Sequence, residues 1–332
     1  MKIILPKFEQ ILSSQKRVSL DLREILLRYP ALGAVFSLLV IFTTFGIIQP
    51  LFLKVTNLTN LLTFTSELGI ISIGVSFLMI SGEFDLSVGS IYGFSAWLFM
   101  IVANATNSIF GLIISIIFGG LIGFINGFIS FKFKLPSFIV TLGMKMILAG
   151  MLNGLMAGRS LVYKSDNYIP KIFTSKLIYG IRPTHFLFIF LALLFHGILT
   201  QTRYGNWVMA SGGNKEVARN MGVNPHEVKI KNFIISGMLA ALVGVLVASR
   251  YSLVNPTFGL EKELQAIAAS VIGGCALHGG FGSIIGAAIS AITVGMIKIG
   301  LAMSGLSGYF YETFIGIFLV FAAIINTWIR KF

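Results

Sequence analysis

Apolar residues occur along the chain in long runs that short polar segments interrupt. A helix needs about 20 mostly apolar residues to cross the hydrocarbon core of a bilayer, and about ten runs approach that length. We expect spanning helices at 31–52, 58–80, 86–103, 109–130, 138–158, 184–201, 233–251, 264–277, 283–303 and 313–328. The run at 264–277 is the shortest, and a kinked or incomplete crossing is the alternative to a full one. The pattern predicts an all-α polytopic membrane protein with about ten transmembrane helices.

The long polar interruption of the second half, at 203–231, contains a short helix with its own start and stop signals. Asn214 can cap the free N–H groups of the first turn. Glu216 lies at the positive N-terminal end of that helix, and Arg219 lies near its negative C-terminal end. Gly222 can adopt the left-handed conformation that ends a helix. A capped helix between two spans suits a docking element, and a solvated connecting loop is the simpler alternative.

Several polar side chains fall within or between the predicted spans. An ionisable group at bilayer depth costs at least ~2.5 kcal/mol, so each one is a functional candidate. For Glu67 the alternative is a partner within the chain, such as Lys145. Asp85 also suits the N-cap of the helix at 86–103, and Lys145 and Lys298 could extend to an interface. The candidates for a substrate path are Glu67, Ser81, Glu83, Asp85, Ser87, Lys145 and Asn153.

Composition supports the membrane prediction. Of 332 residues, 56% are hydrophobic and 11% are charged, and the mean hydropathy is +0.90, whereas soluble domains have about 25% charged residues. The net charge of +13 does not indicate a nucleic-acid partner, because Lys and Arg concentrate in segments that the spans place on the inner side. Both termini are expected in the cytoplasm. The loop at 159–183 departs from this rule, because it is placed outside and carries Arg159, Lys164, Lys171, Lys176 and Arg182.

The first thirty residues are expected to form a cytoplasmic or interfacial N-terminal segment, which precedes a transmembrane domain at 31–330. They lack the compact apolar core and cleavage site of a signal peptide. Apolar residues alternate there with Lys and Arg, which is typical of an amphipathic helix that lies on the membrane surface. The single cysteine, Cys275, falls in an apolar run, and a packed, inert thiol is the expected role.

A short string occurs twice and indicates an internal duplication. Gly-Ser-Ile-x-Gly is found at 89–93 and again at 282–286, each time at the opening of a span after a glycine-rich break. Internal repeats of this kind are common in transporters. Most other glycines are expected to let helix backbones approach closely.

No pattern of residues indicates an enzyme. The chain has no Gly-x-x-x-x-Gly-Lys-Ser/Thr phosphate loop, so it is not expected to hydrolyse ATP itself. Its four histidines lack metal-ligand spacing, and neither a Gly-x-Ser-x-Gly nor a His-Glu-x-x-His motif is present. We therefore expect a protein that is not an enzyme and has no metal or cofactor.

Four motifs follow one another along the chain. They are 81–90 (Ser-Gly-Glu-Phe-Asp-Leu-Ser-Val-Gly-Ser), 135–143 (Leu-Pro-Ser-Phe-Ile-Val-Thr-Leu-Gly), 202–223 (Thr-Arg-Tyr-Gly, then Gly-Asn-Lys-Glu-Val-Ala-Arg) and 263–282 (beginning Glu-Leu-Gln-Ala-Ile-Ala-Ala). In this order they resemble the motifs of the ribose/xylose-type permeases of ABC importers. The resemblance spans 35–330. Glu83, Cys275 and Lys298 depart from the usual pattern, which leaves the substrate open.

The resemblance implies a permease that works as a pair, with a second copy of the chain or a close paralogue. A binding protein would deliver sugar from outside, and a pair of cytosolic ATPases would grip a cytoplasmic coupling helix. The residues implied in this coupling are Gly213, Asn214, Glu216, Ala218, Arg219 and Gly222. Closure of the ATPases on ATP would switch the spans between outward-open and inward-open states.

The expected function is thus the transport of a ribose- or xylose-like monosaccharide across the cytoplasmic (inner) membrane, among its lipids, with a separate ATPase as the motor. An ion-coupled secondary transporter that uses Glu67 or Asp85 is the main alternative. Within the family, a hexose, a nucleoside or a furanosyl signalling molecule remains open as the cargo.

Overall fold

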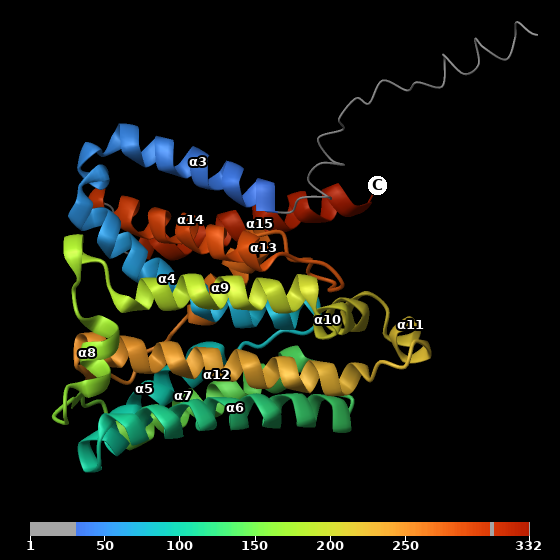
Figure 1. Ribbon diagram of the computed structural model, residues 1–332, viewed down its shortest axis with the longest axis horizontal. Helices are drawn as coiled ribbons and strands as arrows, with labels where there is room; N and C mark the ends of the chain where they lie inside the picture. The colour runs from blue at the N-terminus through green and yellow to red at the C-terminus, as the bar shows by residue number, and fades with distance from the viewer. Residues whose placement is uncertain (1–30, 306–308, 332) are drawn as a thin grey trace, which may run out of the picture.

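The computed structural model describes residues 31–305 and 309–331. The expectations for residues 1–30 lie outside this part of the chain. The described residues are mostly helical (Figure 1). Eight of their helices are long and apolar enough to cross a membrane: α3 (Ala31–Ile48), α4 (Val55–Ile80), α5 (Val88–Ala105), α6 (Ser108–Lys132), α7 (Ser137–Met156), α9 (Pro183–Gln201), α12 (Pro225–Tyr251) and α14 (Ile284–Met303). The all-α membrane fold is confirmed.

The other two expected spans are α13 (Lys262–Ile272) and α15 (Tyr309–Lys331). With 11 residues, α13 is about 16 Å long at 1.5 Å per residue, roughly half of a ~30 Å hydrocarbon core. The length of α13 therefore favours the alternative of an incomplete crossing for the 264–277 run. Within the described part of α15, an apolar stretch runs from Phe310 to Ile325.

Short elements connect the long helices. They are η1 (Pro50–Leu53), β1 (Leu161–Val162), α8 (Tyr168–Thr174), η2 (Ile178–Gly180), α10 (Arg203–Gly213), α11 (Lys215–Asn220) and β2 (Leu253–Val254). The two strands pair antiparallel, with Leu161 opposite Val254. Figure 1 shows α8 and α11 at opposite ends of the long helices, so the 159–183 and 203–231 loops lie at opposite ends of the molecule.

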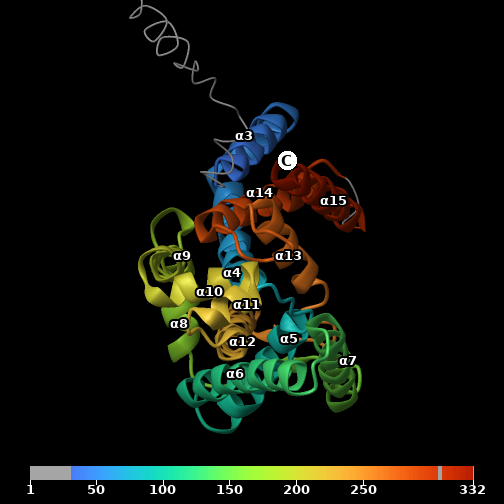
Figure 2. The same ribbon diagram turned by 90° about the vertical axis from the view of Figure 1, so that its right-hand side faces the viewer.

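Helices α4 and α12 form the centre of the bundle. Figure 2 shows them between α3 and α14 on one side and α6 and α7 on the other. The contact of α12 with α6 depends on glycine, because a Cβ on Gly119 would lie 2.3 Å from the carbonyl oxygen of Gly237. A larger residue there would force the helices apart. The outward faces of α6, α7 and α9 expose large apolar side chains such as Phe110, Met146 and Phe190, as lipid contact requires.

Two breaks interrupt helix pairs near the α11 end. The first, at 81–87, joins α4 to α5, and the second, at 273–283, joins α13 to α14. Each contains glycines with positive φ, namely Gly82 in the first break and Gly274, Gly279 and Gly280 in the second. The repeated Gly-Ser-Ile-x-Gly strings lie where α5 and α14 begin, which is consistent with the predicted duplication.

Candidate functional site

The short helix α11 has the N-terminal cap and the C-terminal glycine that the sequence predicts. Asn214 Oδ1 accepts hydrogen bonds from the backbone N–H groups of Glu216 (3.0 Å) and Val217 (3.1 Å). Gly222 has a φ of +80° just after the helix. The predicted cap and stop are confirmed, and they follow from local sequence because each needs only residues within one turn.

One face of α11 is anchored and the other is free. Ala218 is fully buried, whereas Val217 and Met221 are 51% and 76% exposed. The guanidinium of Arg219 lies 2.9 Å from Nε2 of His226 on α12. In Figure 1 α11 projects beyond the ends of the long helices. It therefore offers an exposed apolar pair beside charged groups while it remains fixed to the bundle.

A buried ion pair connects the first helix break to α12. Lys229 is fully buried, and its Nζ donates to Oε1 of Glu83 at 2.6 Å. The Nζ of Lys215, in the first turn of α11, lies 3.8 Å from the same oxygen. Glu83, which departs from the family pattern, thus joins the break, α12 and α11 through one carboxylate.

The end of α10 contacts both helix breaks. The backbone N–H of Gly280 donates to the carbonyl of Ile80 at 2.7 Å. A Cβ on Gly212 would lie 2.0 Å from that same carbonyl oxygen and 2.6 Å from the nitrogen of Gly280. A Cβ on Gly280 would in turn lie 2.6 Å from Cα of Gly213. The backbones touch because side chains are absent, so α10 contacts both breaks directly.

Another contact ties α10 to the bundle. The hydroxyl of Tyr204 donates to Oδ1 of Asn232 on α12 at 2.7 Å, and burial raises the pKa of this tyrosine. The amide of Asn232 in turn donates to the carbonyl of Phe77 on α4 at 3.4 Å. Helix α10 is therefore joined to α12 by a side-chain contact as well as to the breaks by backbone contacts.

The first break is held by a buried polar cluster. Oδ1 of Asp85 accepts from the N–H of Ser87 (2.8 Å) and from its hydroxyl (2.6 Å), and the amide of Asn126 donates to that hydroxyl at 2.9 Å. The prediction that Asp85 caps the next helix is wrong in position, because α5 begins at Val88 and its N-cap residue is Ser87. Asp85 fixes the residue before the first turn. The hydroxyl of Ser81 donates a hydrogen bond to the backbone carbonyl of Leu78, three residues earlier.

The charged residues within the spans pair differently from the expectation. Glu67 forms a bidentate pair with Arg250, with N–O distances of 2.8 and 2.9 Å. Lys145 instead pairs with Glu263 of α13, so it is not the partner of Glu67. Asn153 is exposed and donates to Ala149 of its own helix. That the seven candidates line a substrate path stays a prediction.

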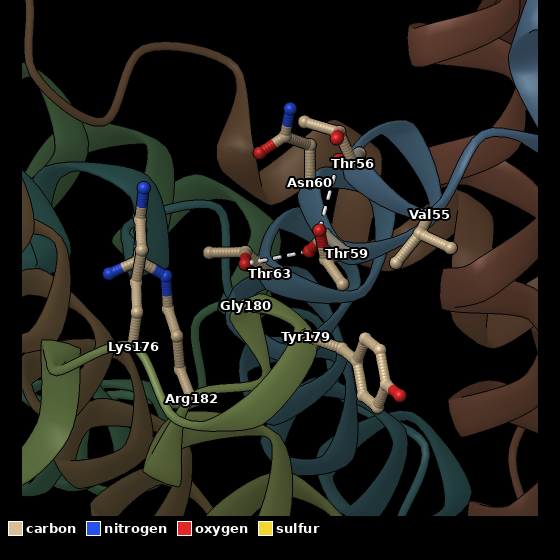
Figure 3. Close-up of a pocket in the computed structure, with 9 residues that line it drawn as sticks. All are labelled: Val55, Thr56, Thr59, Asn60, Thr63, Lys176, Tyr179, Gly180 and Arg182. Carbon is tan, nitrogen blue, oxygen red and sulfur yellow. Dashed lines mark hydrogen bonds between the residues drawn. The ribbon is translucent and has the colours of Figure 1, made fainter.

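A cavity of about 310 Å³ lies at the outer end of α4 (Figure 3). We call the end that carries α8 the outer end. The cavity is lined by Val55, Thr56, Thr59, Asn60, Thr63, Lys176, Tyr179, Gly180 and Arg182. Its volume is within the range of small-molecule pockets. None of the residues predicted to line a substrate path contributes to it.

The outer loop that borders this cavity is fixed by one carboxylate. Asp166 accepts hydrogen bonds from the N–H (3.0 Å) and hydroxyl (2.6 Å) of Ser108 and from the N–H of Tyr168 (2.8 Å). These bonds stabilise the charged form and hold the pKa of Asp166 at about 2, below its usual 3.8. The starts of α6 and α8 are thereby joined.

Comparison with known proteins decides the family. The family described as branched-chain amino acid transport system / permease component matches residues 57–323. The chain belongs to this permease family. The ribose import permease protein RbsC of Bacillus subtilis is 30% identical over 321 residues, which cover 96% of this chain and 98% of that protein. The RbsC protein of Haemophilus influenzae is 33% identical over 278 residues, or 82% of this chain and 86% of that one.

A third relative has a different cargo in its name. The autoinducer 2 import system permease protein LsrC of Yersinia pseudotuberculosis is 30% identical over 291 residues, which cover 86% of this chain and 82% of that protein. No solved structure matches the chain. The expected ribose-type ABC permease is thus confirmed as the family of this chain.

Sequence reasoning missed four partners that the structure assigns within this permease: Asn126, Lys229, Arg250 and Glu263. A signal for three of them was present, because each is a charged residue in or beside an apolar run. Such residues are costly at bilayer depth unless they are paired. The sequence could have nominated them, but not matched each to its partner.

Proposed function

We propose that this permease is the membrane subunit of an ABC importer for a monosaccharide in the cytoplasmic membrane, and that a separate ATPase drives it by docking on α11. One observation carries the proposal: an exposed, capped helix follows directly on the glycines that contact both helix breaks. A secondary transporter does not need an exposed helix that transmits force from an ATPase. The sugar names of two relatives support the cargo class. The autoinducer 2 in the name of the LsrC relative keeps a signalling molecule as the alternative cargo.

The contacts suggest how force would travel. A push on α11 would reach α10 through Asn214, which ends one helix and caps the next. Gly212 and Gly213 would then shift both breaks together, and the Glu83 carboxylate would move with Lys215 and Lys229. Because the breaks begin α5 and α14, their displacement would rock the spans between two states.

The topology of this proposal follows from the two ends of the molecule. The 203–231 loop would face the cytoplasm, with both chain termini on the same side, and the 159–183 loop would face outside. A sugar-binding protein would dock on the outer end. A second copy of the permease, or a close paralogue, would complete the path across the surrounding lipid bilayer.

A charge-reversal pair tests the coupling role. In proteoliposomes with the ATPase and the binding protein, Glu216→Lys/Arg219→Glu is expected to lower ATP-driven uptake at least tenfold while ATP hydrolysis continues. The matched control is Glu227→Lys/Lys231→Glu, which reverses an exposed pair on the neighbouring helix. Normal uptake by the first variant overturns the coupling role. Uptake that survives ATP depletion but stops with an ionophore overturns the ABC assignment in favour of an ion-coupled transporter.

A further inference from the structure

Three cations gather around the carboxylate of Glu67 in the outer half of the bundle. They are Glu67 of α4, Arg250 of α12, Lys262 of α13 and Lys298 of α14, and Glu67 lies within electrostatic reach of all three cations. Both oxygens of Glu67 are engaged by Arg250, at 2.8 and 2.9 Å. That bidentate pair is complete in itself. Glu263 also lies within electrostatic reach of Lys262, but it pairs with Lys145. Lys262 and Lys298 are therefore the two cations of this group without a paired carboxylate.

The two lysines share one aromatic ring. Nζ of Lys298 lies 4.1 Å from the ring centre of Phe64, and Nζ of Lys262 lies 4.8 Å from it. Lys262 also donates to Oε1 of Gln265 at 3.2 Å. Among the residues that the structure describes, neither lysine has a carboxylate oxygen within 4 Å. One ring does not neutralise two like charges, so an anion in contact with both lysines would be bound favourably.

Buried hydroxyl groups near these lysines also lack partners. Tyr311 is 7% exposed, and its ring centre lies 5.6 Å from Nζ of Lys298. Its hydroxyl has no hydrogen-bond partner in the described part of the chain. The same holds for Thr65 Oγ1, which faces Gly295 of α14, 2.7 Å from where a Cβ on that glycine would lie. A buried hydroxyl without a partner is costly. These groups are donors that an oxygen ligand would satisfy.

We propose that Lys262 and Lys298, beside Phe64, form an anion-binding site for a carboxylate or phosphate group. The inference rests on the proposed function in one respect: in an importer for sugars, such a site selects a cargo that carries an acidic group. The same chemistry would hold the phosphate of a lipid headgroup. Both lysines are only partly buried.

The site is tested on the purified full chain in nanodiscs of phosphatidylcholine. Calorimetric titration compares D-ribonate, which carries a carboxylate, with neutral D-ribose. We expect ribonate to bind at least tenfold more tightly than ribose. Lys298→Gln is expected to lose at least tenfold in ribonate affinity, and Lys298→Arg, which keeps the charge, to restore most of it. The matched control is Lys171→Gln, an exposed lysine of the outer loop, which is expected to change the affinity less than twofold.

A second arm identifies the source of the anion. The chain is placed in nanodiscs that contain phosphatidylglycerol, and the lipid it retains is measured by native mass spectrometry. Retention by the wild type and the Lys171→Gln control but not by Lys298→Gln, with weakened ribonate binding, would assign the site to a lipid headgroup. Equal binding of ribose and ribonate without lipid retention would overturn the site, as would unchanged ribonate affinity and lipid retention in Lys298→Gln. Neither arm uses ATP or the ATPase, so failure here leaves the ATP-driven uptake test of the proposed function untouched.

Discussion

Replacing Glu83 by Gln removes the anion from a salt bridge whose cation is fully buried. Lys229 has no exposed surface, and its Nζ lies 2.6 Å from Glu83 Oε1. Removal of one partner from a buried pair leaves an uncompensated charge and costs about 3–5 kcal/mol. We expect Glu83→Gln to lower the free energy of unfolding by about 3 kcal/mol. This is the low end of that range, because the amide oxygen of the Gln can still accept a hydrogen bond from Lys229.

The double variant Glu83→Gln/Lys229→Met separates charge from shape. Once both charges are gone, no buried ion is left unpaired. The free energy of unfolding of the double variant should therefore be lower than that of the wild type by about 1 kcal/mol or less. The coupling energy of the cycle is then at least about 2 kcal/mol. The matched control is the exposed pair of Glu227 and Lys231, 2.7 Å apart and one turn apart on α12, for which about 0.3–0.5 kcal/mol is expected.

The assay is reversible unfolding of the purified chain by sodium dodecyl sulfate in mixed micelles, followed by circular dichroism. The four proteins of each cycle are measured under one set of conditions. A Glu83–Lys229 coupling energy as small as that of the exposed control would contradict this prediction, because it would mean that water reaches Lys229 despite its burial.

Two further predictions concern backbone packing and pH. Gly212→Ala should cost about 1–3 kcal/mol by overpacking and lower ATP-driven uptake, because its Cβ would lie 2.0 Å from the Ile80 carbonyl oxygen. Gly143→Ala, with nothing within 4 Å, is the control, and equal melting temperatures would contradict the prediction. The pKa of Asp166 is lowered to about 2 from 3.8. The contribution of this carboxylate to the stability of the fold is therefore present above pH 3.8 and is lost as the pH falls toward 2. The difference in melting temperature between the wild type and Asp166→Asn should shrink in that window. A constant difference down to pH 2 would show that the Asp166 carboxylate does not stabilise the fold.

Local sequence was sufficient wherever the deciding interaction lies within a few residues. The lengths of the apolar runs predicted the eight long helices, because a span needs only enough apolar residues in succession. Asn214 and Gly222 predicted the start and stop of α11, because a cap and a left-handed residue act within one turn. The four ordered motifs carried the family resemblance that the comparisons confirmed.

Tertiary structure decided which charge meets which. Glu67 and Arg250 are 183 positions apart, and Lys145 lies 118 positions from its partner Glu263. The rotation and tilt of each helix choose between such partners, and both depend on how all the helices pack. Only that packing brings Gly212 against Ile80 and Gly280, and places Lys262 and Lys298 over one ring. The sequence thus determined the helices and the protein's family, whereas the three-dimensional packing determined the contacts on which coupling and cargo selection would depend.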